Sequence, residues 1–259
     1  MLTEQKISKT TLDHLAFCPS SEVYQWATTL VIAPHPDDET LGCGGAIALL
    51  RQMGYRVHVM VLSDGYHSHP FGGINDRDAF RNSIRKDTIQ ALAELGVSND
   101  SLTFLGLNDS LLPTENEAGF EEVVRMCRNK IADFKPDTIL TPWRKDAHSD
   151  HRAAWHITKS ALSLENLQDV NVVAYAHWAL HGENELLWPS TAEVHPWRLD
   201  IKPVLEKKIK ALSAYDTHQP KDISQHSIFE TDVLSQFTHP WELYLDQQAL
   251  RSYTSLGLG

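Results

Sequence analysis

Short apolar runs alternate with longer amphipathic stretches through most of the chain. The runs are rich in β-branched and aliphatic residues, as is typical of buried strands. We predict strands at Thr28–Ala33, Arg56–Leu62, Leu102–Leu107, Thr138–Thr141 and Asn171–Ala176. The longer stretches have helical spacing and often end at glycine. We predict helices at Ala46–Met53, Asp76–Leu95, Phe120–Phe134, Asp150–Leu164 and Pro203–Tyr215.

This alternation of strand and helix predicts an α/β fold. We expect a Rossmann-like, mainly parallel sheet with helices on both faces. Ligands of such sheets bind beyond the carboxyl ends of the strands. The sequence contains no low-complexity stretch, no repeat and no Pro/Gly/Ser-rich linker. Residues 1–259 are therefore expected to form a single domain.

The composition excludes several classes of partner. The chain has 34 acidic and 23 basic residues, a formal charge of -11. An acidic surface repels phosphate backbones, so we expect neither nucleic acid nor an anionic membrane surface as a partner. No apolar run is long enough for a membrane span or a signal peptide. The three cysteines show no CxxC spacing, which argues against a disulfide framework and favours a cytoplasmic protein.

A dense group of potential metal ligands directly follows the first predicted strand. The segment Pro34–Glu39 places His35, Asp37 and Asp38 within four residues. Acidic side chains next to a buried strand are costly to bury unless a cation balances them. Imidazole and carboxylate groups are ordinary zinc ligands. His35 and Asp38 are three residues apart, so one loop can direct both at one ion, with Asp37 beside it.

A second group, Asp146–His151, follows the predicted strand Thr138–Thr141. His148 and His151 are three residues apart, which places them on one face at the start of a helix. Two ligands from the first group and one histidine from the second would leave a position for water, as in catalytic zinc sites. Either group alone could be a solvated loop with helix-capping acids. Their joint position at the carboxyl edge of one predicted sheet favours the metal site.

Two other features have simpler interpretations. The segment Gly42–Gly45 invites a dinucleotide-binding interpretation, but Ile47 occupies the place of the third glycine. The acidic residues before it would also repel a pyrophosphate, so we expect these glycines to let a helix start close to the metal loop. Arg77 and Arg81 have helical spacing and are expected on a solvated face.

The two groups together resemble the motifs of the PIG-L/LmbE-like zinc-dependent deacetylases. The resemblance rests on APHPDDE at 33–39 and HSDH at 148–151. Weaker matches connect them: Ser63–Gly65, Arg85–Asp87 leading to Leu95–Gly96, and Leu105–Leu107 with Asp109. The similarity extends from Thr28 to about Gln219. It implies the same LmbE-like deacetylase fold for this chain.

The resemblance also implies roles for individual residues. It makes His35, Asp38 and His151 the zinc ligands and Asp37 the general base. His148 would stabilise or protonate the tetrahedral intermediate, and Asp150 would orient a neighbouring histidine. By the same resemblance, Arg85 and Asp109 contact the substrate.

We therefore expect a zinc-dependent hydrolase that removes the N-acetyl group from an amino sugar or its conjugate. Ligand type alone leaves another divalent ion, such as Fe²⁺, open as the metal. The alternatives are a zinc amidohydrolase for a non-sugar amide and a non-catalytic, metal-dependent carbohydrate-binding module. Asp37 separates the enzyme from the binder, because a binder needs no base beside a complete ligand set. We expect the loops Tyr66–Asn75 and Asn108–Leu112 to determine substrate specificity. The sequence leaves the oligomeric state open, and a homo-oligomer is possible.

Overall fold

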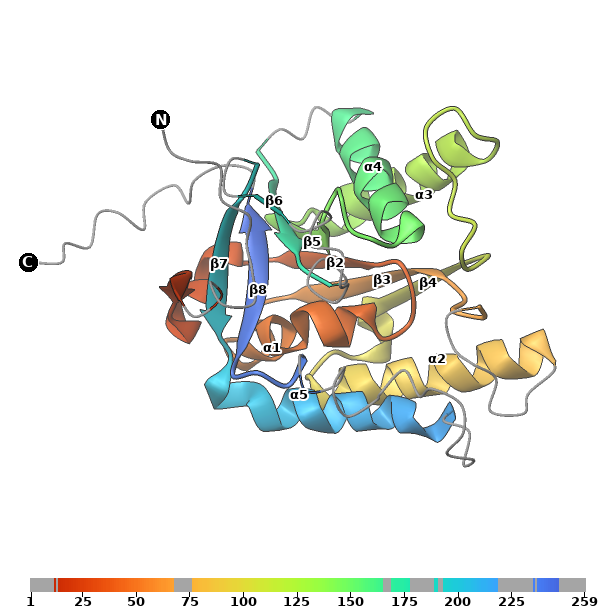
Figure 1. Ribbon diagram of the computed structural model, residues 1–259. Helices are drawn as coiled ribbons and strands as arrows, with labels where there is room; N and C mark the ends of the chain where they lie inside the picture. The colour runs from red at the N-terminus through yellow and green to blue at the C-terminus, as the bar shows by residue number, and fades with distance from the viewer. Residues whose placement is uncertain are drawn as a thin grey trace, which may run out of the picture.

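Eight strands form one sheet in the order β1-β7-β8-β6-β5-β2-β3-β4 (Figure 1). The computed structural model describes residues 14–67, 76–164, 169–177, 193–218 and 237–246, together with Leu12, Pro189, Ser190 and Ser235. The strands are β1 (Ala16–Cys18), β2 (Thr29–Ala33), β3 (Val57–Ser63), β4 (Leu102–Leu107), β5 (Thr138–Pro142), β6 (Asn171–Tyr175), β7 (His195–Asp200) and β8 (Trp241–Asp246).

The sheet is mainly parallel. Strands β6, β5, β2, β3 and β4 are parallel neighbours, and β1 pairs in parallel with β7. Only β8 runs antiparallel to its neighbours, β6 and β7, within the described sheet. The predicted α/β class is confirmed, and all five predicted strands are present. The strands β1, β7 and β8 were not predicted, because β1 is short and charged residues interrupt the other two.

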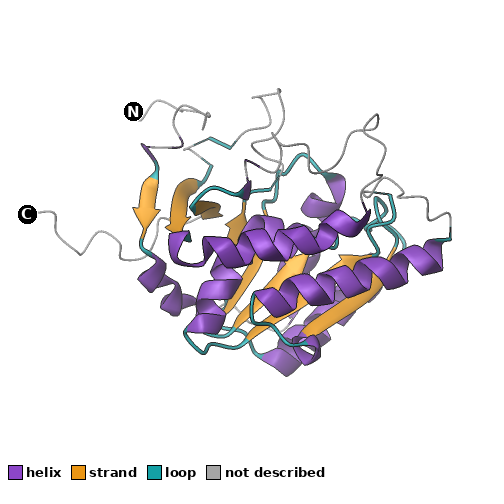
Figure 2. Cartoon of the chain, turned by 90° about the horizontal axis from the view of Figure 1, so that it is seen from below, coloured by secondary structure: helices purple, strands orange, loops and turns teal. Residues whose placement is uncertain are grey.

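Helices cover both faces of the sheet, as predicted. The α-helices are α1 (Asp38–Gln52), α2 (Arg77–Glu94), α3 (Phe120–Phe134), α4 (Ser149–Leu164) and α5 (Leu205–Leu212). The 3₁₀ helices are η2 (Ser20–Trp26), η3 (Asn99–Ser101), η6 (Lys202–Val204) and η7 (Ser213–His218). Helices α1, α2 and α5 lie on one face and α3 and α4 on the other (Figure 1). Figure 2, viewed from the side of the first three, shows helices lying across the strands.

Alternate residues of the central strands supply two separate cores. Val31 and Val59 pack towards α1 and α2, whereas Leu30 and Met60 pack towards α3 and α4. All four side chains are buried, as expected for strands covered on both faces. Among the described helices, none combines the length and apolar character needed to cross a membrane.

Helix α1 begins at Asp38, eight residues before the predicted start. It is kinked at Cys43, whose backbone is not helical (φ -146°, ψ 22°). A side chain at Gly42 would overlap the ring of Tyr175, and one at Gly45 would overlap Ile201. These two glycines therefore allow the helix to pack directly against the sheet. Their role is close packing within a helix rather than the loop that the sequence suggested.

A buried ion pair holds the second half of α1. The backbone N–H groups of Gly45 and Ala46 donate to the Glu242 carboxylate at 2.6 and 3.0 Å. The Lys208 ammonium donates to the same carboxylate at 2.7 Å and to the Leu41 carbonyl at 2.9 Å. Glu242 is thus an acceptor for the free N–H groups that follow the kink. This contact ties α1 to α5 and β8.

We expect His58 to make folding sensitive to mild acid. Burial and the neighbouring Lys130 lower the pKa of His58 on β3 from 6.5 to about 4. Its Nε2 contacts Thr103 Oγ1 at 2.8 Å. Below pH 6.5 the unfolded chain binds a proton that the folded chain does not bind until about pH 4. The stability is therefore complete above pH 6.5 and is lost as the pH falls towards 4, by up to about 3 kcal/mol.

Urea unfolding of the wild type and His58→Gln between pH 7.5 and 4.5 measures this effect. The wild type should lose more unfolding free energy than the variant as the pH falls. Parallel curves for the two proteins would show that His58 does not contribute.

Candidate metal and catalytic site

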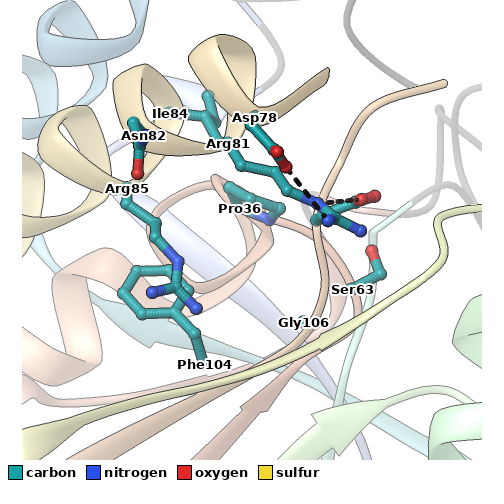
Figure 3. Close-up of a pocket in the computed structure, with 10 residues that line it drawn as sticks. Pro36, Ser63, Asp78, Arg81, Asn82, Ile84, Arg85, Phe104 and Gly106 are labelled. Atoms are coloured by element: carbon teal, nitrogen blue, oxygen red, sulfur yellow. Dashed lines mark hydrogen bonds and ion pairs between the residues drawn. The ribbon is translucent and has the colours of Figure 1, made fainter. Parts of the chain in front are cut away.

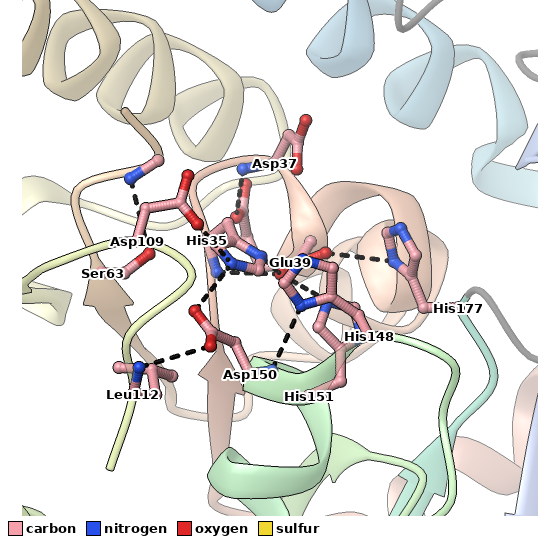
Figure 4. A network of polar contacts seen from close by, with 12 residues as sticks. His35, Asp37, Glu39, Ser63, Asp109, Leu112, His148, Asp150, His151 and His177 are labelled. Carbon is pink, nitrogen blue, oxygen red and sulfur yellow. Dashed lines mark hydrogen bonds and ion pairs between the residues drawn. The ribbon is translucent and has the colours of Figure 1, made fainter. Parts of the chain in front are cut away.

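Most of the predicted site residues come together beyond the carboxyl ends of the five adjacent parallel strands (Figure 4), whereas Arg85 lies on α2. His35 follows β2, Asp64 follows β3, and Asp109 follows β4. The Asp146–His151 segment lies between β5 and α4, and His177 follows β6. The position at one sheet edge agrees with the general location of ligand sites in α/β folds.

Asp38 lies at the centre of the site. Its Oδ2 is 3.1 Å from His35 Nδ1 and 3.3 Å from His151 Nε2. Its Oδ1 is 3.2 Å from His177 Nδ1. Burial raises the pKa of the Asp38 carboxyl, but His151 and His177 outweigh burial and hold the pKa well below its ordinary value. Asp38 is therefore an ionised carboxylate surrounded by imidazoles.

The separations of Asp38 from His35 and His151 fit a tetrahedral metal site. Two ligands that are each about 2.0–2.1 Å from a tetrahedral zinc ion lie about 3.3 Å apart. The contacts of Asp38 Oδ2 with His35 and His151, at 3.1 and 3.3 Å, match that spacing. Two further groups also bring ligand atoms within 4.8 Å of one another. They are His35–His148–His151 and His35–Asp109–Asp150.

The charges of the site also fit a bound cation. Five aspartates are buried here: Asp37, Asp38, Asp109, Asp146 and Asp150. Burial lowers the pKa of His151, but Asp38 and Asp146 reverse the effect and raise it to about 9. The His151 imidazole therefore lies where positive charge is strongly favoured. A metal ion can supply that charge when it displaces the proton.

Carboxylates also hold the outer sides of the two histidines. His151 Nδ1 is 3.4 Å from Asp146 Oδ1. His35 Nε2 is 3.0 Å from Asp109 Oδ1 and 3.3 Å from Asp150 Oδ2. Carboxylates in this position orient metal-binding imidazoles. The expected orienting role of Asp150 agrees with its position.

Asp109, the expected substrate contact, lies next to His35. Its side chain is fully buried beneath His35. Its Oδ2 accepts a hydrogen bond from the His67 backbone N–H at 2.7 Å. Asp109 is therefore placed to support His35, and its expected contact with the substrate stays a prediction.

Asp37 has an unusual backbone conformation at the first turn of α1. Its φ is +93°, and its backbone N–H donates to Glu39 Oε2 at 3.1 Å. Glu39 in turn accepts hydrogen bonds from the Tyr215 hydroxyl at 2.6 Å and the Thr40 hydroxyl at 2.7 Å. Burial raises the pKa of Glu39 to about 7. Glu39 and Tyr215 thus stabilise a strained backbone that carries the expected base.

His148 is half-buried beside His35 and His151. The Asp150 backbone N–H donates to His148 Nδ1 at 3.2 Å. Since Nδ1 accepts this bond, the neutral ring carries its proton on Nε2. Burial and the nearby His35 and His151 lower the pKa of His148, which favours this neutral form.

Arg77 and Arg81 do not lie on a purely solvated face, so that prediction is wrong. Their Nε atoms donate to Asp64 Oδ2 at 2.9 and 2.7 Å. Burial raises the pKa of Asp64, but these two arginines and nearby backbone N–H groups lower it below the ordinary value. Asp64 Oδ1 accepts the Asp109 N–H at 3.2 Å. The arginines therefore support the site through Asp64 and Asp109.

Three residues with roles in this geometry received no role in the sequence analysis: Glu39, Asp146 and His177. Glu39 and Asp146 belong to the recognised acidic groups, but spacing alone did not show what they contact. His177 directly follows the predicted strand Asn171–Ala176. Its position after that strand, at the same carboxyl edge of the predicted sheet, could have marked His177 as a site residue. Of the loop Tyr66–Asn75, residues 68–75 lie outside the described part of the chain.

The fold and the site define an α/β protein with a buried histidine–aspartate site for a divalent metal. Residues 30–162 match the family model PIG-L: GlcNAc-PI de-N-acetylase, which covers just over half of the chain. The chain belongs to this family.

Its relatives include named deacetylases. A probable N-acetyl-alpha-D-glucosaminyl L-malate deacetylase 2 of Bacillus subtilis is 30% identical over 192 residues, covering 73% of this chain and 81% of that protein. The diacetylchitobiose deacetylase of Thermococcus kodakarensis is 26% identical over 209 residues, covering 75% and 71%. The fold is also similar to that of GalB, the 4-carboxy-2-hydroxymuconate hydratase of Pseudomonas putida KT2440 (TM-score 0.61, 20% identity, 82% and 83% coverage).

Proposed function

We propose that this protein is a zinc-dependent N-deacetylase for an N-acetylated amino sugar or its conjugate. The observation that carries the proposal is the arrangement around Asp38, with His35 and His151 at ligand spacing and Asp37 adjacent in the chain. The deacetylase relatives support the sugar class of the substrate. Acetate release from a panel of N-acetyl sugars, with and without added zinc, tests the proposal.

His35, Asp38 and His151 would hold the metal. When bound, zinc lowers the pKa of a nearby water and polarises a carbonyl group. The histidines' outer partners, Asp146, Asp109 and Asp150, keep the rings in place before the substrate arrives.

The other two residues move protons. Asp37 takes a proton from the water as the water attacks the amide carbonyl. His148 donates a hydrogen bond from Nε2 to the oxyanion that develops on the carbonyl oxygen. Asp37 then passes the proton that it took from the water to the amine nitrogen as the C–N bond breaks, which releases acetate and the free amine. The Asp150 backbone N–H fixes the ring of His148 in the donating form.

We expect His151→Ala to lose most of its bound metal. The two remaining ligands hold zinc poorly, because a stable protein site needs at least three. Metal content measured by mass spectrometry should be about one zinc per chain for the wild type and well below one for the variant. His156→Ala is the matched control, since this exposed histidine lies on the same helix and should keep the metal. Full occupancy in His151→Ala would contradict the ligand assignment.

A further inference from the structure

A cavity of about 340 Å³ opens between α2 and the β3–β4 edge of the sheet (Figure 3). Its lining includes Pro36, Asp64, Arg81, Arg85, Phe104 and Gly106. Pro36 stands between the expected metal ligand His35 and the expected base Asp37. The cavity therefore adjoins the catalytic loop, and its size falls in the range of small-molecule sites.

The charged groups around the cavity are unequally paired. Arg77 and Arg81 both bind Asp64, and Arg81 also lies 3.6 Å from the exposed Asp78. Arg85 forms no ion pair with any carboxylate in the described ranges. The lining carries two arginines and two aspartates, and both aspartates already lie against Arg81, which leaves the Arg85 charge without a carboxylate partner among the described residues.

Arg85 is held in a geometry suited to binding a ligand. Its guanidinium carbon lies 4.6 Å from the centre of the Phe104 ring. A cation at this distance from an aromatic ring is attracted to its face. Figure 3 shows the guanidinium of Arg85 beside this ring in the cavity. The guanidinium edge carries several N–H donors that match a carboxylate or a phosphate.

We infer that this cavity binds an anionic group of the substrate, a carboxylate or a phosphate, through Arg85. The inference rests on the proposed function, since it identifies the occupant as the part of the N-acetyl sugar conjugate beyond the reacting amide. Arg81, held by Asp64, lines the same cavity. The charge of the conjugate would then decide which substrates bind well.

Binding of simple anions tests the inference without catalysis. Inorganic phosphate and glycolate are titrated calorimetrically into the full-length, zinc-loaded wild type, Arg85→Met and Arg56→Met. Arg56 is the matched control, because its exposed guanidinium lies 4.7 Å from the Phe134 ring, away from the cavity. We expect Arg85→Met to weaken the binding of at least one probe by about tenfold or more, and Arg56→Met to leave it unchanged. An anion that binds to the metal itself should bind with the same affinity to all three proteins.

A kinetic comparison identifies the anion. The substrates are N-acetylglucosamine, its 6-phosphate and its carboxymethyl glycoside. Arg85→Met should raise KM for one or both charged substrates by about tenfold more than it raises KM for the neutral sugar. The charged substrate that is affected shows whether the group is a phosphate or a carboxylate.

Two results would overturn the inference. One is anion binding that is equal in the wild type and Arg85→Met, or absent from both. The other is an equal rise in KM for charged and neutral substrates, which would show that Arg85 binds sugar hydroxyls. If the wild type released acetate from none of the three substrates, that result would count against the proposed function instead. The calorimetry would still test anion binding by Arg85.

Discussion

Asp37→Asn should lower kcat by about 10²–10⁴-fold while the metal stays bound. Asparagine is nearly the same size as aspartate but cannot take a proton from water. The proposed metal ligands His35, Asp38 and His151 are unchanged in this variant, so its zinc content should equal that of the wild type. Some activity should remain, because a bound metal still lowers the pKa of water.

Measurements of turnover, zinc content and melting temperature on this variant separate three roles of Asp37. If Asp37 were a metal ligand, the variant would lose zinc along with activity. If Asp37 were only a helix cap, the variant would lose about 1 kcal/mol or less and keep its rate. The Asp37 side chain makes no capping hydrogen bond, whereas Asp76 caps α2 by accepting the Asp78 N–H at 2.9 Å. Asp76→Asn is therefore the control for a pure capping effect.

Glu242→Gln should lower the free energy of unfolding by about 3–5 kcal/mol. The substitution removes the only carboxylate on the Lys208 ammonium in the described structure and leaves a buried positive charge. It also weakens the acceptor for the Gly45 and Ala46 N–H groups. Chemical denaturation, with the midpoint and slope measured for both proteins, gives the difference.

An exposed ion pair provides the control for Glu242. Glu94 and Lys210 lie 2.8 Å apart, but the Lys210 side chain is 68% exposed. Glu94→Gln should therefore cost less than about 1 kcal/mol. The double variant Lys208→Met, Glu242→Gln should recover part of the loss, because it removes the unpaired charge. Equal losses for Glu242→Gln and Glu94→Gln would contradict the role of the buried pair.

Much of the fold and site followed from local sequence patterns. The apolar runs identified five parallel strands, of which β2, β3 and β5 are buried throughout and β4 and β6 only in part. The order of strands and helices then placed His35, Asp109 and His151 at one sheet edge. Spacing within the first motif suggested that His35 and Asp38 could reach one ion, and the structure places these two side chains 3.1 Å apart.

The remaining features depend on contacts between distant parts of the chain. The start of α1 was missed because its glycines resemble a loop, and their packing against Tyr175 and Ile201 leaves no local signal. Glu242 contacts Gly45 across 197 residues. The support of Glu39 by Tyr215 spans 176 residues. Charge pairing also explains why Arg77 and Arg81 were misjudged, since their partner Asp64 lies on another element.

Acetate release by metal-free and zinc-reconstituted protein tests the central claim most directly. The full-length protein is treated with a chelator, freed of it, and assayed on N-acetylglucosamine and a set of its conjugates before and after addition of one equivalent of zinc. We expect no significant acetate release without metal and recovery of activity with zinc, with at least one conjugate as a substrate. Full activity of the metal-free protein, or no acetate from any N-acetyl sugar with zinc bound, would contradict a zinc-dependent sugar deacetylase.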